Sequence, residues 1–143
     1  MEKSAVQVYN GTVIQNFLVG AEECEGKIFF LKYKLAKTPA QFPDALFYTK
    51  SLEEAIIYAV CTAKDVQDEP IVLSGKTKHY PYIPGNKPFK IESVYILKDK
   101  LTTMNAIIDC IDSKNRRAGL VKLEDYFIEE SPIEILRRLQ GNR

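Results

Sequence analysis

The chain has 143 residues, of which 45% are hydrophobic and 27% are charged, and this balance argues against a disordered or fibrous protein. Its 20 basic and 19 acidic side chains give a net charge of +1, so the chain as a whole has no long-range attraction for nucleic acid or an anionic membrane. The length suits one domain, and we predict a single domain over residues 1–143.

The cysteines and the histidine argue against most metal and redox sites. Cys24, Cys61 and Cys110 are widely spaced and form no C-x-x-C pair, and His79 is the only histidine. This pattern predicts neither a zinc site nor a thioredoxin-like motif. The N-terminal residues lack the apolar run of a signal peptide, and no apolar stretch is long enough to span a membrane. We therefore expect a cytoplasmic protein without membrane contact.

The first predicted elements are short strands. Asn10-Gly11 lies between two apolar runs, a pattern typical of a tight β-hairpin, and predicts strands over residues 5–9 and 12–16. A further strand is expected over residues 27–35, where apolar and charged residues alternate. The side chains expected on one face of this strand are Phe29, Leu31, Tyr33 and Leu35.

The clearest helix signal in the chain begins at Ser51. Ser51 and Glu54 form the S-x-x-E pattern of a capping box, and the apolar residues that follow recur at the spacing of one helix face. This predicts a helix from Ser51 to about Lys64, between short strands over residues 46–49 and 71–75. The expected apolar stripe consists of Leu52, Ala55, Ile56, Ala59, Val60 and Ala63.

The second half of the chain predicts a long loop followed by two strands and two helices. Prolines, a glycine and lysines mark residues 76–88 as a loop, and apolar runs predict strands over 89–98 and 120–129. Helices are expected over 101–112 and from Ser131-Pro132 to Gly141. About six strands and about three helices, unevenly interleaved, favour an α+β fold with a mostly antiparallel or split β-sheet.

Three short stretches together resemble the ADP-ribosyltransferase superfamily. In that family a first strand ends in an aromatic residue, a His or Arg, then Gly and Thr or Ser. A later strand carries an aromatic-Thr-x-Ser pattern and leads into a helix with Ala-x-x-Tyr-Ala. The resemblance covers residues 8–75, about half of the chain. The matching residues are Tyr9, Gly11, Thr12, Phe47, Tyr48, Thr49, Ser51, Ala55, Tyr58 and Ala59.

The resemblance implies a split sheet with a cleft that holds NAD in a compact shape. It implies that the Gly11 backbone binds the nicotinamide amide, that the Tyr48 ring stacks on nicotinamide, and that Glu92 or Glu124 stabilises the oxocarbenium-like ribose. Asn10 stands where the family has His or Arg, which weakens catalysis more than binding because an amide still forms hydrogen bonds. The full expected cofactor-binding set is Tyr9, Asn10, Gly11, Thr12, Tyr48, Ser51 and Tyr58.

Two functional interpretations follow, beside the simpler possibility of a small α+β subunit that self-associates through an exposed strand edge. The first is an ADP-ribosyltransferase-like domain that binds NAD or a related nucleotide, with a nucleotide or protein substrate if it is active. The second is a non-enzymatic interaction protein of viral or mobile-element type that binds a host protein or single-stranded nucleic acid through residues 76–88. That loop interleaves lysines with tyrosines, which suits phosphates and stacked bases. A solvated loop, and solvent-facing roles for Glu92 and Glu124, are the structural alternatives.

Overall fold

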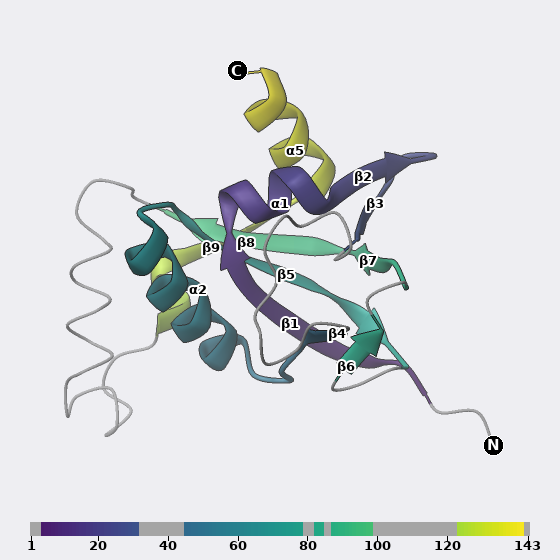
Figure 1. The fold of residues 1–143 in the computed structure, drawn as a ribbon, viewed down its shortest axis with the longest axis horizontal. Coiled ribbons are helices and arrows are strands. Elements are labelled where there is room, and N and C mark those ends of the chain that lie inside the picture. Colours follow the sequence, from purple (N-terminus) through teal and green to yellow (C-terminus); the bar gives the residue numbers. More distant parts are fainter. Residues whose placement is uncertain (1–3, 32–44, 79–81, 85–86, 99–122, 142–143) are drawn as a thin grey trace.

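The computed structural model describes residues 4–31, 45–78, 82–84, 87–98 and 123–141 (Figure 1). The strands in this part of the chain are β1 (Val6–Val13), β2 (Ala21–Cys24), β3 (Lys27–Phe30), β4 (Ala45–Phe47), β5 (Pro70–Thr77), β6 (Tyr82–Pro84), β7 (Phe89–Ile91), β8 (Ser93–Leu97) and β9 (Phe127–Glu130). They form a large sheet of order β1-β5-β8-β9, a second sheet of order β2-β3-β7, and the pair β4-β6. Every pairing between these strands is antiparallel.

The helices lie on both sides of the large sheet. They are α1 (Ile14–Gly20), α2 (Leu52–Val66), the 3-10 helix η2 (Leu123–Tyr126) and α5 (Pro132–Gly141). α2 packs on β1 and β5, whereas α1 and α5 contact each other beside β3 (Figure 1). No helix in the described residues is long and apolar enough to cross a membrane. The predicted α+β class with mostly antiparallel sheets is confirmed.

The large sheet separates two hydrophobic cores, and β5 contributes to both. Ile71 and Leu73 face the core that α1, α5 and the second sheet share, while Val72 faces the core beneath α2. Both faces of β5 are buried from Pro70 to Gly75, and its first four residues, Pro70 to Leu73, are accordingly a continuous apolar run rather than an alternation. The buried strand predicted over 71–75 is therefore confirmed, with one residue more at its start and two more at its end.

The helix predicted at Ser51 is confirmed. The Ser51 hydroxyl accepts a hydrogen bond from the Glu54 N–H at 3.2 Å, and α2 ends where Gln67 adopts a left-handed conformation with φ 57°. The buried side chains of α2 belong to the stripe expected from the sequence. They are Ala55, Ile56, Ala59, Val60 and Ala63.

The hairpin predicted at Asn10-Gly11 is wrong. β1 passes through both residues without a turn, and the whole strand pairs with β5. A Cβ atom on Gly11 would lie 2.0 Å from the Ala55 carbonyl oxygen and 2.8 Å from the Ala59 nitrogen. Gly11 is therefore the point at which the α2 backbone approaches the sheet, a role that needs glycine for close contact rather than for a turn.

The tight turn in this region lies between β2 and β3 instead. Glu25 and Gly26 have positive φ angles of 53° and 77°, as a two-residue hairpin turn requires. Residues 14–16, predicted as strand, begin α1.

The start of α1 is capped by a distant loop rather than by its own sequence. Val13 occupies the N-cap position without a side-chain hydrogen bond. The Ile14 N–H donates to the Glu69 carbonyl oxygen at 2.9 Å, and the Gln15 N–H donates to Asp68 Oδ2 at 2.9 Å. The loop that follows α2 therefore satisfies N–H groups that a helix start leaves free.

Replacing Asp68 by alanine is expected to lower the free energy of unfolding by about 1 kcal/mol, the usual effect of removing a helix cap. Chemical denaturation measures this change. Asp65→Ala is the matched control, because Asp65 is exposed in the last turn of α2 and lies outside the cap. Equal losses in the two variants would contradict the capping role of Asp68.

The strand predicted over residues 89–98 is two strands that belong to different sheets. β7 pairs with β3, whereas β8 pairs with β5 and β9. Glu92 lies between them, and its N–H donates to the Ser74 carbonyl oxygen at 2.8 Å. A Cβ atom on Gly75 would lie 2.4 Å from the Lys90 carbonyl oxygen, so β5 and β7 cross in close contact here. Phe89 and Ile91 on β7 belong to one core and Leu97 on β8 to the other, so this segment is divided between the two cores.

The end of the chain differs in part from the prediction. Within the range 120–129 the described residues form η2 and then β9, so Glu124 lies on a 3-10 helix and not on a strand. The range 76–88, predicted as a loop, contains the end of β5 and all of β6. The terminal helix is confirmed as α5. The helix predicted over 101–112 lies outside the described residues.

Candidate functional site

The first two of the three stretches that carry the family resemblance lie side by side in the structure. The Tyr9 N–H donates to the Thr49 carbonyl oxygen at 2.7 Å, and the Thr49 N–H donates to the Tyr9 carbonyl oxygen at 3.0 Å. This reciprocal pair joins β1 to the segment that leads into α2. We refer to Tyr9, Thr49, Ser51 and Glu54 as the β1–α2 junction.

Polar side chains at the junction fix the start of α2. The Thr49 hydroxyl donates to Glu54 Oε2 at 2.7 Å and accepts from the Ser51 N–H at 3.1 Å. The Glu54 carboxylate is thus bound through Thr49, instead of directly to the Ser51 N–H as in a reciprocal capping box. Thr49 is buried and Ser51 is half-buried. The Ser51 hydroxyl accepts from the helix and keeps its own hydrogen for a further acceptor.

A row of three side chains extends from the junction across the large sheet. The Tyr9 and Tyr95 rings pack edge to face, with centroids 6.2 Å apart, and the Tyr95 hydroxyl donates to Glu129 Oε2 at 3.1 Å. Partial burial, together with Glu129, raises the pKa of Tyr95 to about 12, so its hydroxyl remains a donor at neutral pH. Both tyrosines are half-buried and Glu129 is exposed. We refer to these three residues as the Tyr9–Glu129 row.

The structure places Tyr48 inside the core rather than on a ligand-accessible surface. Its side chain is fully buried with Val8 and Phe17, and its ring centroid lies 4.6 Å from that of Phe89. Burial raises the pKa of Tyr48, and its hydroxyl forms no hydrogen bond with another of the residues that the structure describes. Stacking on nicotinamide, as the resemblance implies, would require this ring to leave the core.

The other predicted cofactor residues are dispersed. Gly11 faces the α2 backbone, while the side chains of Asn10 and Thr12 point to the opposite face of β1. The Thr12 hydroxyl is buried and accepts from Asn16 Nδ2 at 3.0 Å. Tyr58 is 58% exposed on α2, a helix whose opposite face is buried. Of the seven residues predicted to bind the cofactor, two belong to the junction, namely Tyr9 and Ser51.

Neither predicted catalytic carboxylate belongs to the Tyr9–Glu129 row. Glu92 is exposed at the corner between β7 and β8, where it lines a pocket with Lys27 and Lys90. Glu124 lies on η2, which packs against α2. Glu129 is the acidic residue that the sequence reasoning missed, because its proximity to Tyr95 depends on the β8–β9 register. In the described part of the chain, no cluster of three or more His, Cys, Asp or Glu side chains could hold a metal ion.

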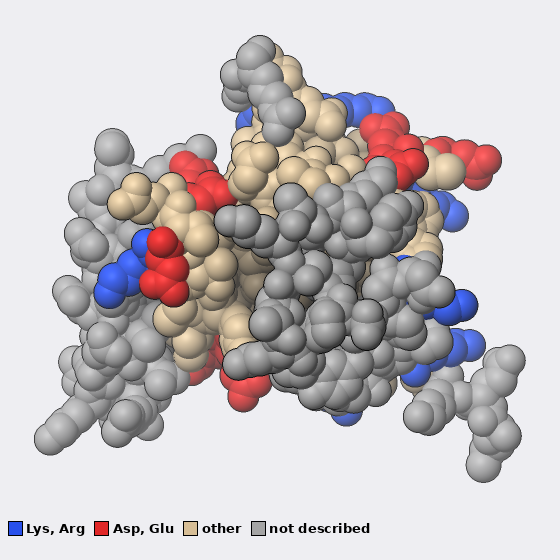
Figure 2. Space-filling view, in the orientation of Figure 1, with Lys and Arg blue, Asp and Glu red and all other residues tan. Residues whose placement is uncertain are grey.

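The lysines of the predicted nucleic-acid loop are exposed. Lys76, Lys78 and Lys87 lie at the end of β5 and just before β7, whereas His79 and Tyr80 lie outside the described residues. Figure 2 shows basic side chains along the margin of the molecule beside β3 and β7.

Comparisons with protein-family models, with curated protein sequences and with solved structures found no match to this chain. The functional interpretation therefore depends on the geometry of the junction and of the row beside it.

Proposed function

We propose that this chain is an ADP-ribosyltransferase-like domain that binds NAD or a related nucleotide at the β1–α2 junction. The observation that supports the proposal best is the reciprocal backbone pair between Tyr9 and Thr49. The resemblance implies that residues of the first strand and of the segment that opens the helix both contact NAD. Such shared contacts require these two stretches to be adjacent, and the Tyr9–Thr49 pair holds them together.

The Tyr9–Glu129 row supplies the groups that a nucleotide needs beside the junction. The half-buried rings of Tyr9 and Tyr95 offer aromatic surface for a flat heterocycle. Glu129 accepts from the Tyr95 hydroxyl and, as an exposed carboxylate, retains acceptor capacity for a ribose hydroxyl. In a transferase the same carboxylate would stabilise positive charge that develops on the ribose.

The residues of this chain favour NAD binding over efficient transfer of ADP-ribose. Asn10 stands where the family has His or Arg, and its side chain points to the face of β1 opposite to that of Tyr9. Gly11 is covered by α2, and Tyr48 is buried. Three of the roles that the resemblance implies therefore have no residue in place, whereas stacking on Tyr9 or Tyr95 and a ribose contact with Glu129 do not depend on them.

NAD is expected to raise the melting temperature of the protein, because a ligand of the native state stabilises it by about 2.7 kcal/mol at 100 times its Kd. Glu129→Gln is expected to reduce this shift without lowering the melting temperature of the ligand-free protein, since Glu129 is exposed. Val66→Ala is the control, because Val66 is exposed at the end of α2 remote from the junction and should leave the shift unchanged. Differential scanning fluorimetry measures all three.

The absence of any shift at millimolar NAD would contradict the proposal. An equal shift with ADP-ribose would place the recognition on the adenosine and ribose parts and not on nicotinamide. A shift with a single-stranded oligonucleotide but not with NAD would favour the alternative function, in which the lysines at 76, 78 and 87 contact phosphates.

A further inference from the structure

A buried serine of β5 lies beside the Tyr9–Glu129 row. Ser74 is 2% exposed and is the register partner of Tyr9, and its hydroxyl accepts a hydrogen bond from Gln7 Nε2. The residue directly opposite Gln7 is Lys76, so the Gln7 amide reaches diagonally to the position that faces Tyr9. This hydrogen bond holds the amide beside the Tyr9 side chain in a fixed orientation.

The Gln7 amide and the two aromatic rings of the row belong to one face of the large sheet. Gln7, Tyr9 and Gly11 alternate along β1 and therefore share the face on which α2 lies. The α2 backbone contacts this face at Gly11, and the segment that enters the helix meets β1 at Tyr9, so Gln7 lies beyond the start of α2. Gln7, Tyr9 and Tyr95 are all half-buried, which leaves part of each side chain accessible to a ligand.

The Gln7 amide keeps a donor and an acceptor for that ligand. One of its two N–H groups is bound to Ser74, and the described residues form no other hydrogen bond with its second N–H group or its carbonyl oxygen. At the N6/N7 edge adenine offers a donor and an acceptor, which match this pair, whereas guanine and hypoxanthine offer two acceptors there. An amide that Ser74 holds in place therefore favours adenine over a 6-oxopurine.

The distance across the sheet favours a dinucleotide over a mononucleotide. Gln7 is on β1 and Glu129 is on β9, the two edge strands of the order β1-β5-β8-β9. Three strand spacings of about 4.8 Å each separate these edges. The base and the ribose of one nucleoside are directly bonded, so they are too close together to occupy both ends of this face. Adenine at Gln7 and a second ribose at Glu129 would fill it, with the rings of Tyr9 and Tyr95 between them.

We propose that Gln7 selects adenine, and that the ligand of this face is an adenine dinucleotide. The inference rests on the proposed nucleotide binding at the β1–α2 junction, and it names the base that is recognised and the residue that recognises it. Gln7 is the specificity-determining residue, and Ser74 is the positioning residue that orients its amide. Glu129 contacts the second ribose and has no part in the choice of base.

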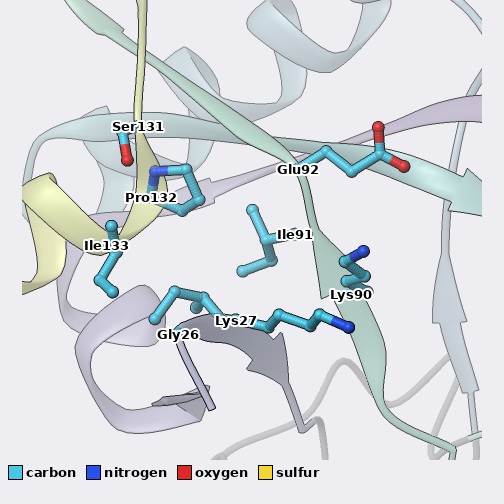
Figure 3. Close-up of a pocket in the computed structure, with 9 residues that line it drawn as sticks. Gly26, Lys27, Lys90, Ile91, Glu92, Ser131, Pro132 and Ile133 are labelled. Carbon is cyan, nitrogen blue, oxygen red and sulfur yellow. The ribbon is translucent and has the colours of Figure 1, made fainter. Parts of the chain in front are cut away.

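The pocket between the start of β3, the β7–β8 corner and α5 is separate from this site (Figure 3). Ile28 and Ile91 in its wall are 1% and 3% exposed, and the β3–β7 register places Lys27 and Lys90 on the opposite face of that sheet, so charge and apolar surface do not face one ligand there. The pocket contains no residue of β1 or β5. A ligand held in it would therefore not respond to a change at Gln7.

NAD and nicotinamide hypoxanthine dinucleotide are suitable probes, because they differ only in the purine, which carries an amino group or an oxygen at position 6. The wild type is expected to bind NAD about tenfold more tightly, as one bidentate contact to adenine allows. Gln7→Met keeps the length of the side chain and removes both hydrogen-bonding groups, so the two affinities should become equal. Glu129→Gln should weaken both dinucleotides and leave their ratio unchanged. Gln140→Met is the matched control, because Gln140 is exposed on α5. Isothermal titration calorimetry gives the affinities.

Equal binding of the two dinucleotides by the wild type overturns the role of Gln7 and leaves the proposed function standing, because NAD still binds. A preference for NAD that Gln7→Met retains, or that Gln140→Met loses to the same extent, also overturns it. If Gln7→Met lowers the melting temperature of the ligand-free protein, Gln7→Met/Ser74→Ala removes the hydroxyl that is left unpaired and carries the same expectation. Binding of neither dinucleotide contradicts the proposed function itself, and the inference with it.

Discussion

Replacing Gly11 by alanine is expected to destabilise the protein by about 3 kcal/mol, the upper end of the usual cost of overpacking. The new Cβ atom would lie 2.0 Å from the Ala55 carbonyl oxygen, so α2 and β1 must separate. Because backbone atoms form the contact, no rotation of a side chain relieves it. Urea denaturation should show the loss, and hydrogen exchange should show faster opening of α2 amides.

Alanine substitutions at two other glycines show whether the loss of stability is specific to the contact at Gly11. A Cβ atom on Gly141, at the end of α5, would meet no atom within 4 Å, so Gly141→Ala should not destabilise the protein. Gly26 also has open space but a φ of +77°, so Gly26→Ala should cost about 1 kcal/mol through backbone strain alone. A Gly11→Ala variant as stable as the wild type would mean that α2 does not approach β1 so closely.

Replacing Tyr48 by alanine is expected to cost about 3–5 kcal/mol, the range for removing a large aromatic side chain from a core. Tyr48→Phe, in contrast, should leave stability unchanged or raise it by about 1 kcal/mol, because the buried hydroxyl forms no hydrogen bond within the described part of the chain. Thermal and chemical denaturation of the two variants test both statements.

A clear loss of stability in Tyr48→Phe would contradict this interpretation and indicate a partner for the hydroxyl, such as an internal water. The phenylalanine variant also tests the ligand role that the family resemblance implies. If Tyr48 is a core residue, the NAD response of Tyr48→Phe should equal that of the wild type. The alanine variant is unsuitable for this purpose, because its loss of binding would follow from its loss of structure.

The helices that the sequence predicts well are those whose signals are local. Ser51 caps α2 three residues before Glu54, and the apolar spacing that follows lies within the helix itself. The start of α5 at Ser131-Pro132 is equally local. In these segments the residues that decide the structure are neighbours in the chain, so a pattern reveals them.

The N-terminal segment was mispredicted because its determinants are distant. Asn10-Gly11 has strong turn propensity, yet the contact that requires Gly11 is with Ala55 on α2. The cap of α1 comes from Asp68. Neither contact can be recognised from the local pattern, and tertiary packing overrides the turn propensity.

The strand faces were ambiguous for a related reason. In the run Ile28-Phe29-Phe30 every residue is apolar, so alternation does not choose a face. The structure buries Ile28 and Phe30 and leaves Phe29 half-buried, the reverse of the predicted face. No sequence pattern marks the corner at Glu92, because the residues on either side of it all favour a strand.

The candidate site was predictable in part. The motif match singled out Tyr9 and Ser51, which the structure brings to one junction. Glu129 could not be found in this way, since its link to Tyr95 depends on which residues of β8 and β9 lie opposite each other. A one-residue change of register would place Glu129 on the other face.

The Tyr9–Thr49 pair has a further consequence for the first strand of the large sheet. β1 is an edge strand in the order β1-β5-β8-β9, and edge strands expose backbone groups to which a strand of another molecule can bind. At Tyr9 both groups are already bound to Thr49. The segment that forms the junction therefore also covers the β1 edge at this position and blocks edge-to-edge pairing there.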